Sequence, residues 1–280
     1  MVMLKARLTI FVIMGSACCA AQSVGAAAAP SAHFQAGVAF EHAGDFDKAI
    51  EEYKQAIQET PNHADSHYNL GRLLAERQDS GDAIRQFREA LRIAPDDADV
   101  HNYLGVVLRN TGDTAGAEKE YKEALRLNPK MAAAHNNLGN LLYRNQQLTP
   151  AMVEYRAAVE ADPSNPESHM NLGSALDDSG DTNGAIKEYK ESVRLDPGNA
   201  NAHYNLSISL AKTHNAAGAI AELREAEKLK PDWPVPHIWL FTLLVKSDPK
   251  GALEECRTAD NLTHDPKVHD VCEKLAAQIK

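Results

Sequence analysis

Histidine recurs along the chain at a constant spacing, and histidine is a common side chain for proton transfer and metal binding. Seven copies are 34 residues apart without an insertion: His33, His67, His101, His135, His169, His203 and His237. Equivalent residues of packed repeats lie at least one helix spacing apart, about 8–10 Å. A zinc ion lies only about 2.0–2.1 Å from an imidazole nitrogen. These histidines therefore cannot share a metal ion, and we expect them to fill a packing position between helices.

Other arrangements that could support chemistry are also weak. His63 and His67 have an i, i+4 spacing, but His63 is expected to precede the helix, and His264 and His269 are too loosely spaced to suggest a site. The chain has no phosphate-binding glycine loop, nucleophile elbow or zinc-finger cysteine pattern. Its carboxylates are plentiful, but no pair stands out as a general acid and base. We therefore expect no enzymatic activity, no metal and no cofactor.

Composition favours a folded helical protein. The 280 residues are 44% hydrophobic and only 6% aromatic, and alanine, leucine, glutamate and lysine, which favour helix, are abundant. The formal net charge of −10 gives no reason to expect a nucleic-acid partner.

The 34-residue period also orders the apolar residues into two stripes per unit, which predicts two helices per unit. In one unit the stripes consist of Leu138, Gly139 and Leu142, then of Ala151, Tyr155 and Ala158. Pairs such as Gly112 and Asp113 lie between the stripes, where glycine suits a left-handed helix end and aspartate a helix N-cap. A proline closes each of six units: Pro61, Pro95, Pro129, Pro163, Pro197 and Pro231.

This pattern of Leu-Gly, alanine, an aromatic residue, alanine and proline resembles the tetratricopeptide repeat family, with histidine where that family often has tryptophan. The resemblance implies an all-α fold, a right-handed superhelix of about seven helix pairs. Six repeats are expected at 30–63, 64–97, 98–131, 132–165, 166–199 and 200–233. A degenerate seventh repeat is expected at 234–265, where Phe241 replaces a small residue, followed by a capping helix at 266–280. The repeats are most similar to those of O-linked N-acetylglucosamine transferase, but no length remains here for its catalytic domain.

The N-terminal residues 1–26 are expected to form a signal peptide. Lys5 and Arg7 precede the apolar run LTIFVIMGSACCA, which is short for a membrane span and typical of a signal-peptide core. Val24 and Ala26 flank the expected cleavage point, and 27–31 is expected to be a short disordered lead-in. The mature chain is thus expected in the bacterial periplasm or outside the cell, without a membrane span. A retained N-terminal anchor and lipidation of Cys18 or Cys19 are the alternatives.

Two cysteines remain in the expected mature chain, Cys256 and Cys272. An oxidising exterior permits a disulfide between them. If the last two helices form a hairpin around Thr263, both sulfurs lie at a comparable distance from the bend. We expect a disulfide that fastens the C-terminal cap; two buried free thiols are the alternative.

The remaining candidate chemistry is a series of asparagines. In the string HNNLG, Asn137 lies about 200° around the helix from His135 and points away from the packing stripe. The family resemblance implies that first helices line a concave wall, and that Asn69, Asn137, Asn171 and Asn205 form a ladder holding an extended peptide by its backbone. A carboxamide offers a donor and an acceptor, and three extended residues, at about 3.3 Å each, match a repeat spacing of about 10 Å. Tyr103 interrupts the ladder. Flanking groove residues are expected to be Tyr68, Arg72, Asn102, Arg109, Asn136, Asn140, Tyr143, Met170 and Tyr204. The alternative is that the asparagines are solvated and bind nothing.

The sequence therefore predicts a non-catalytic scaffold that binds a protein or peptide segment. Alternatives are an accessory or assembly subunit of a cell-envelope complex, such as pilus or cell-wall machinery, or of an envelope enzyme, and a weak hydrolase that the sequence does not reveal. The oligomeric state is open. Trp233, Ile238 and Trp239 could form an apolar contact patch, although packing under the capping helix is the simpler interpretation.

Overall fold

The computed structural model of the chain describes residues 31–279, so the expected signal peptide and the lead-in before Ser31 lie outside the described residues. Residues 31–279 form fifteen α-helices and no strand. Within this range, none of the helices combines the length and apolarity needed to cross a membrane. The helices are α1 (Ala32–His42), α2 (Phe46–Glu59), α3 (Ala64–Glu76), α4 (Ser80–Ile93), α5 (Ala98–Asn110), α6 (Thr114–Leu127), α7 (Ala132–Arg144), α8 (Leu148–Ala161), α9 (Pro166–Asp178), α10 (Thr182–Leu195), α11 (Ala200–Lys212), α12 (Ala216–Leu229), α13 (Pro234–Leu244), α14 (Pro249–Thr263) and α15 (Pro266–Ile279).

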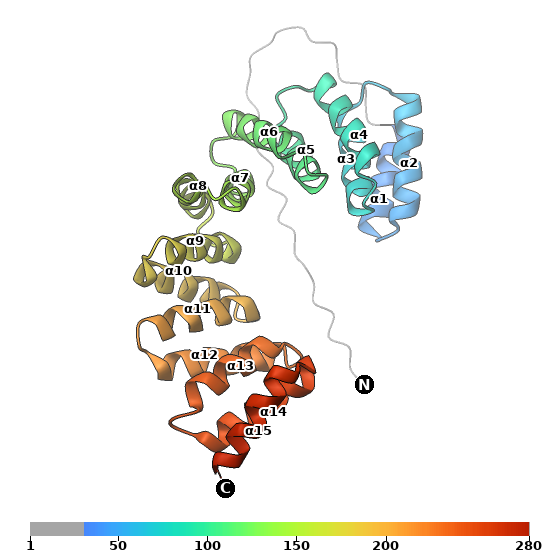
Figure 1. Cartoon of the computed structure of the whole chain (residues 1–280). Helices are drawn as coiled ribbons and strands as arrows, with labels where there is room; N and C mark the ends of the chain where they lie inside the picture. The colour runs from blue at the N-terminus through green and yellow to red at the C-terminus, as the bar shows by residue number, and fades with distance from the viewer. Residues whose placement is uncertain (1–30, 280) are drawn as a thin grey trace.

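Successive helix pairs stack into the expected right-handed α-α superhelix, an arc that runs from α1 at one end to α15 at the other (Figure 1). The two helices of a pair pack together, and the second helix of each pair packs on the first helix of the next. In residues 31–279, the first helices of neighbouring pairs also contact one another more extensively than the second helices do. The first helices, α3, α5, α7, α9 and α11, therefore form the inner, concave layer of the curved stack.

Each of the first five pairs is held together by a glycine on its first helix and an aromatic ring on its second. A Cβ atom added to Gly139 would lie 2.6 Å from Cε1 of Tyr155, and one added to Gly105 would lie 2.6 Å from Cε1 of Tyr121. The rings of Tyr121 and Tyr155 are almost wholly buried. The glycine thus permits the close helix approach that buries the ring, which stabilises the pair through apolar burial and dispersion contacts.

The turn inside each of the first six pairs uses one residue in the left-handed conformation. Gly44, Gly112 and Gly180 take φ values of 77°, 88° and 91°, as their place between the stripes predicted. The next residue caps the second helix in these repeats; Asp113, for example, accepts a hydrogen bond from the backbone N–H of Gly116 at 2.9 Å. Gln146 takes the same conformation at φ 61° without the freedom of glycine.

The recurring histidines join three segments rather than filling an apolar gap. In the fourth pair, Nδ1 of His135 lies 2.7 Å from a carboxylate oxygen of Glu154 on the second helix. Its Nε2 lies 3.1 Å from the carbonyl oxygen of Pro129, at the end of the preceding pair. Both ring nitrogens therefore face an acceptor, which favours the doubly protonated ring. We call each such unit a histidine clamp, formed with glutamate by His101, His135, His169 and His203 and with a glutamine by His67.

The clamps change the acidity of their rings. The hydrogen bond to Glu154, opposed by burial and helped by the Pro129 carbonyl, raises the pKa of His135 above its usual value. Burial opposes the charged form of His101, but hydrogen bonds to Glu120 and to the Pro95 carbonyl outweigh it and raise that pKa as well. The imidazolium is thus the form that the folded chain favours at these two positions.

The seventh pair exchanges the sizes of the two packing residues and is fastened to the final helix. Phe241 stands in α13 where the first helices of the first five pairs have glycine, and Cys256 stands in α14 where their second helices have an aromatic ring; the sixth pair has Ser207 and Leu223 at these positions. Cys256 and Cys272 form a disulfide between α14 and α15, with an S–S distance of 2.04 Å. Trp239 packs against the apolar cluster around Leu240, whereas Ile238 remains 37% exposed.

Candidate functional site

The asparagine ladder lies on the concave layer, one residue per helix. Asn69 on α3, Asn137 on α7, Asn171 on α9 and Asn205 on α11 are each half-buried. Tyr103 occupies the equivalent place on α5. The four carboxamides therefore occupy equivalent places one repeat apart along the inner layer.

Part of the hydrogen-bonding capacity of these amides is used between repeats. Nδ2 of Asn137 donates to Oδ1 of Asn102 in the preceding repeat at 2.9 Å. Nδ2 of Asn136 donates to Oγ of Ser168 in the following repeat at 2.6 Å. Nδ2 of Asn171 and Oδ1 of Asn136, which correspond to the bonded Asn137 and Asn102 atoms one repeat on, are buried without a partner. Within the ladder, Nδ2 of Asn171 is thus an unused donor, whereas Nδ2 of Asn137 is bonded to the scaffold.

Asn102 and Asn136 were expected to flank the groove, and the structure corrects this assignment. Each side chain is only 6% exposed. They lie at the junction between neighbouring first helices, as their hydrogen bonds to adjacent repeats indicate. Residues at this junction hold the stack together and offer little surface to a ligand.

An aromatic group surrounds the interruption of the ladder. The rings of Tyr68 and Tyr103 meet edge to face with centroids 5.6 Å apart, and the Tyr103 ring stacks on Phe87 at 6.2 Å. Tyr68 and Tyr103 are half-buried, so both residues of the concave layer keep some exposed surface. At this ladder position the concave layer therefore offers an aromatic surface in place of a carboxamide.

Charged groups of the concave layer are mostly paired within the chain. Arg72 pairs with Glu41, and Lys212 pairs with Asp177 at 2.7 Å. Arg109 bonds only to the side chain of Asn110, at 3.3 Å, and has no carboxylate partner among residues 31–279. Arg109 is therefore the flanking cation best able to meet a partner's carboxylate.

The remaining flanking residues contact their own scaffold. Asn140 accepts a hydrogen bond from the hydroxyl of Tyr155 at 2.8 Å, and Tyr143 donates to Asp178. The ring of Tyr204 lies 5.0 Å from that of Trp233. Met170 is half-buried against the core. These residues shape the groove wall more than they project from it.

Two buried hydroxyls among residues 31–279 have no hydrogen-bond partner, those of Tyr121 and Ser209. The side chain of Tyr121 is fully buried, and its hydroxyl makes no hydrogen bond in the described chain. Burial raises the pKa of Tyr121 to about 12, and nearby Arg109 opposes that rise. The phenol therefore stays protonated at neutral pH and acts as a hydrogen-bond donor, not as a base.

One group of side chains in the described residues has metal-ligand geometry. Glu227, His237 and Glu255 place one ligand atom each within 4.8 Å of one another. Arg224 contacts both carboxylates, at 2.9 Å from Glu227 and more closely at Glu255. Nδ1 of His237 lies 2.7 Å from Glu255. The guanidinium and the imidazole thus already supply cations to these carboxylates, and the group is a clamp with an added arginine.

The sequence interpretation overlooked the clamp glutamates. They lie 19 residues after the histidines, as Glu120 follows His101 and Glu154 follows His135, so the 34-residue period held the signal. The ion pairs of Arg72 and Lys212 carried no comparable signal, because the position that holds Glu41 and Asp177 carries Ala75, Arg109 and Tyr143 in the repeats between them.

Comparisons with known proteins give one consistent family. A family model described as tetratricopeptide repeat matches residues 20–64, 34–98, 68–124 and 102–166. A second model described as TPR repeat matches residues 176–213. No curated protein matches the chain in sequence.

Solved structures share the fold at low sequence identity. YrrB, described as a TPR protein with an unusual peptide-binding site, is 24% identical, with a TM-score of 0.56 over 67% of this chain and 96% of its own. The structure of pilF from Pseudomonas aeruginosa is 22% identical, with a TM-score of 0.67 over 75% of this chain and 96% of its own. MamA residues 41 to the end from Desulfovibrio magneticus RS-1 are 23% identical, with a TM-score of 0.54 over 60% of this chain and 95% of that chain. These likenesses concern the fold.

Proposed function

The chain belongs to the tetratricopeptide repeat family, and from this premise we propose that it is a non-catalytic scaffold that binds an extended peptide or protein segment in its concave groove. The family supports a role in protein–protein interaction. The finer assignment, binding along the groove, rests on the ladder of Asn69, Asn137, Asn171 and Asn205.

The observation that carries the proposal is the unused polarity of this ladder. Asn205 makes no described hydrogen bond through its side chain, and Nδ2 of Asn171 is unpaired. The half-buried side chains of Asn171 and Asn205 thus have capacity that the scaffold does not use, and an extended peptide offers one N–H and one C=O per residue to pair with their accessible atoms. The ladder therefore supports recognition of backbone, with Tyr68, Tyr103 and Arg109 supplying selectivity.

The sharpest test uses ladder residues that do little for stability. Asn171→Ala with Asn205→Ala removes two carboxamides that donate no described hydrogen bond. Asn137→Ala is less suitable, because it also removes the bond to Asn102 at 2.9 Å. Exposed Asn183 and Asn201 provide the matched control variant, Asn183→Ala with Asn201→Ala.

The partner is first identified by affinity capture from an extract of the source cells and reduced to its binding segment. The ladder variant is expected to bind that segment at least about tenfold more weakly, about 1.4 kcal/mol, with an unchanged melting temperature. The control variant is expected to bind as the parent does. Equal binding by the ladder variant removes the groove assignment.

Export of the chain is part of the proposal. The apolar run near the N-terminus supports it, and so does the disulfide between Cys256 and Cys272, since disulfides persist in oxidising compartments. The test is a thiol count on protein purified from its native location. No reactive thiol at either residue is expected, and two reactive thiols contradict export to an oxidising compartment.

A further inference from the structure

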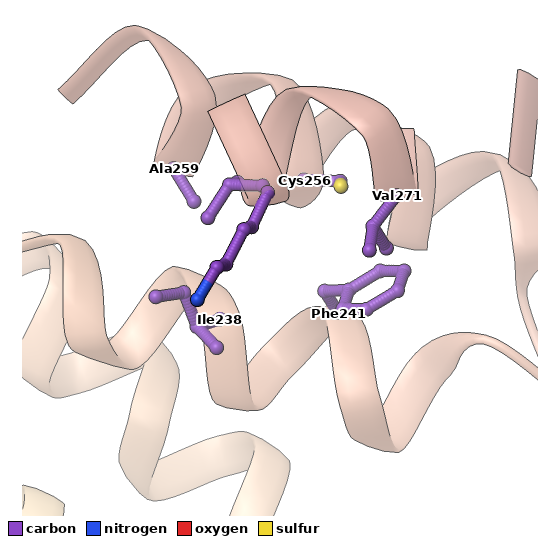
Figure 2. A pocket seen from close by; sticks show the side chains of 7 residues that line it. Ile238, Phe241, Cys256, Ala259 and Val271 are labelled. Atoms are coloured by element: carbon purple, nitrogen blue, oxygen red, sulfur yellow. The ribbon is translucent and has the colours of Figure 1, made fainter. Parts of the chain in front are cut away.

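A pocket opens at the C-terminal end of the superhelix, away from the ladder. It encloses about 210 Å³ and is lined by Ile238, Phe241, Cys256, Ala259, Val268 and Val271, with Lys267. Figure 2 shows Ile238 and Phe241 of α13 on one side and Cys256, Ala259 and Val271 of α14 and α15 on the other. We call it the cap pocket. Its lining is almost wholly apolar.

The pocket follows from the exchanged packing residues of the seventh pair. In the first five pairs, a tyrosine or phenylalanine from the second helix fills the space over the glycine of the first, and in the sixth pair Leu223 packs at the ring position. Cys256 occupies that aromatic position in α14, and its side chain is bonded to Cys272 of α15. A small side chain therefore stands where a ring would fill the space, and the disulfide holds α15 in place as the opposite wall.

The rim of the pocket leaves apolar surface in water. Ile238 is 37% exposed and Val271 is 42% exposed. The volume of about 210 Å³ is below the range of about 300–1,000 Å³ typical of sites that enclose a whole small molecule. The size therefore suits one aliphatic side chain, whose burial is worth about 1.5–3 kcal/mol.

A single unpaired cation accompanies this apolar site. Lys267 lines the pocket, and its ammonium has no ion pair among residues 31–279. Lys267 is the one charged residue of the lining, with an apolar methylene stem and a terminal ammonium. Lys267 also lies in the first turn of α15, where the helix dipole favours a negative group. The best occupant thus combines an aliphatic side chain with an adjacent anion.

We propose that the cap pocket binds the C-terminal residue of a protein partner, with its aliphatic side chain among Ile238, Phe241 and Val271 and its α-carboxylate on Lys267. A C-terminal residue supplies both features on one carbon atom. The pocket lies one helix pair beyond Asn205, the last ladder residue, and its recognition chemistry does not rest on the proposed function of the groove.

The test uses the full chain with labelled isoleucine and valine methyl groups, titrated with the peptide Gly-Ser-Gly-Ser-Leu and followed by NMR. The free-acid peptide is expected to shift the methyl signals of Ile238, Val268 and Val271 saturably. The same peptide ending in alanine is expected to bind about tenfold more weakly, the effect of about 1.4 kcal/mol of lost apolar burial. Val271→Ser, a change at an exposed position, is also expected to lower the affinity for the leucine peptide.

The charge is tested separately with the C-terminal amide of the leucine peptide. The parent is expected to prefer the free acid by about threefold or more, the range of a partly solvated ion pair. Lys267→Gln is expected to abolish that preference. Lys274→Gln, on the same helix but paired with Asp270, is the matched control and is expected to keep it.

Equal binding of acid and amide by the parent overturns the proposal, and so do shifts confined to other methyl groups. The same shifts caused by raising the protein concentration alone overturn it too, because they would indicate a second copy of the chain. Tighter binding of laurate than of the peptide at these methyl groups also overturns it in favour of a lipid acyl chain. The two proposals can fail separately, because the Asn171→Ala and Asn205→Ala variant leaves α13 to α15 unchanged. If the cap pocket does not bind the peptide but this variant still binds its captured partner more weakly, only the cap-pocket proposal is contradicted.

Discussion

The histidine clamps make the stability of the superhelix depend on pH over the range in which histidine titrates. The rings of His101 and His135 each face a glutamate and a proline carbonyl, and the folded chain raises the pKa of both. A group with a raised folded pKa contributes its full stability below the unfolded value, about 6.5. That contribution is lost as the pH rises through the folded pKa. We therefore expect the chain to be more stable on the acid side of this window.

The magnitude follows from the bond types. A hydrogen bond to a charged group contributes about 1.5–3 kcal/mol and a neutral one about 0.5–1.5 kcal/mol, so each clamp loses about 1 kcal/mol when its ring loses the proton. For the clamps of His101 and His135 together, the loss is about 2 kcal/mol between about pH 6 and about pH 8.5. His67 is the built-in comparison, because its partner Gln86, at 2.7 Å, is neutral.

The decisive variant converts two clamps to the glutamine type, Glu120→Gln with Glu154→Gln. A carboxamide can donate to the unprotonated Nδ1 while Nε2 keeps its bond to the proline carbonyl, so a neutral ring is fully satisfied. Urea unfolding of the variant is expected to lose about 2 kcal/mol less than the parent over the same pH window. Gln86→Glu, which converts the His67 clamp to the glutamate type, is expected to steepen the dependence of stability on pH. An unchanged pH slope in the glutamine variant would refute the charged-clamp interpretation.

Two further predictions concern the packing and the turns of the repeats. Gln146→Gly with Gln147→Asp is expected to raise the free energy of unfolding by about 1–2 kcal/mol. The reason is that Gln146 has a φ of 61° and that Gln147 makes no capping bond. A chemical unfolding curve that shows no gain in stability contradicts this prediction. Gly139→Ala is expected to lower it by about 1–3 kcal/mol, since the new Cβ would lie 2.6 Å from the Tyr155 ring, and Gly81→Ala, with no atom within 4 Å, is the control.

The repeated architecture was predictable because it depends on local spacing. The stripes around Gly139 and Tyr155 and the turn at Gly112 and Asp113 recur in phase, and each marks a feature of a single helix pair or turn. Contacts between helices were harder to foresee. A helical wheel of α7 alone places Asn136 near the groove, but the neighbouring helix α9 covers it through Ser168.

The C-terminal cap marks the other limit of sequence reasoning. The pair Cys256 and Cys272 could be proposed from cysteine counting and from the expected hairpin. The cap pocket could not, because it arises where Phe241 and Cys256 exchange sizes relative to the other pairs, and only the resulting three-dimensional gap reveals it. The 34-residue period was enough to predict which asparagines occupy equivalent positions. The hydrogen bond between Asn137 and Asn102 was not predictable, because it depends on how closely two repeats approach.

Each clamp also determines how far a local opening spreads through the stack. The imidazole of His135 is tied to its own second helix through Glu154 and to the previous repeat through the Pro129 carbonyl, so the same ring serves an internal bond and a boundary bond. The stability of a repeat protein is approximately the sum of the stability of each repeat and the interaction energy between neighbouring repeats. Because one ring contributes to both, these two energies change together when the ring gains or loses its proton. At the far end, the corresponding contact of His237 with Pro231 lengthens to 3.5 Å. Fraying is therefore expected to start at that terminal boundary, while the central repeats open as one cooperative block.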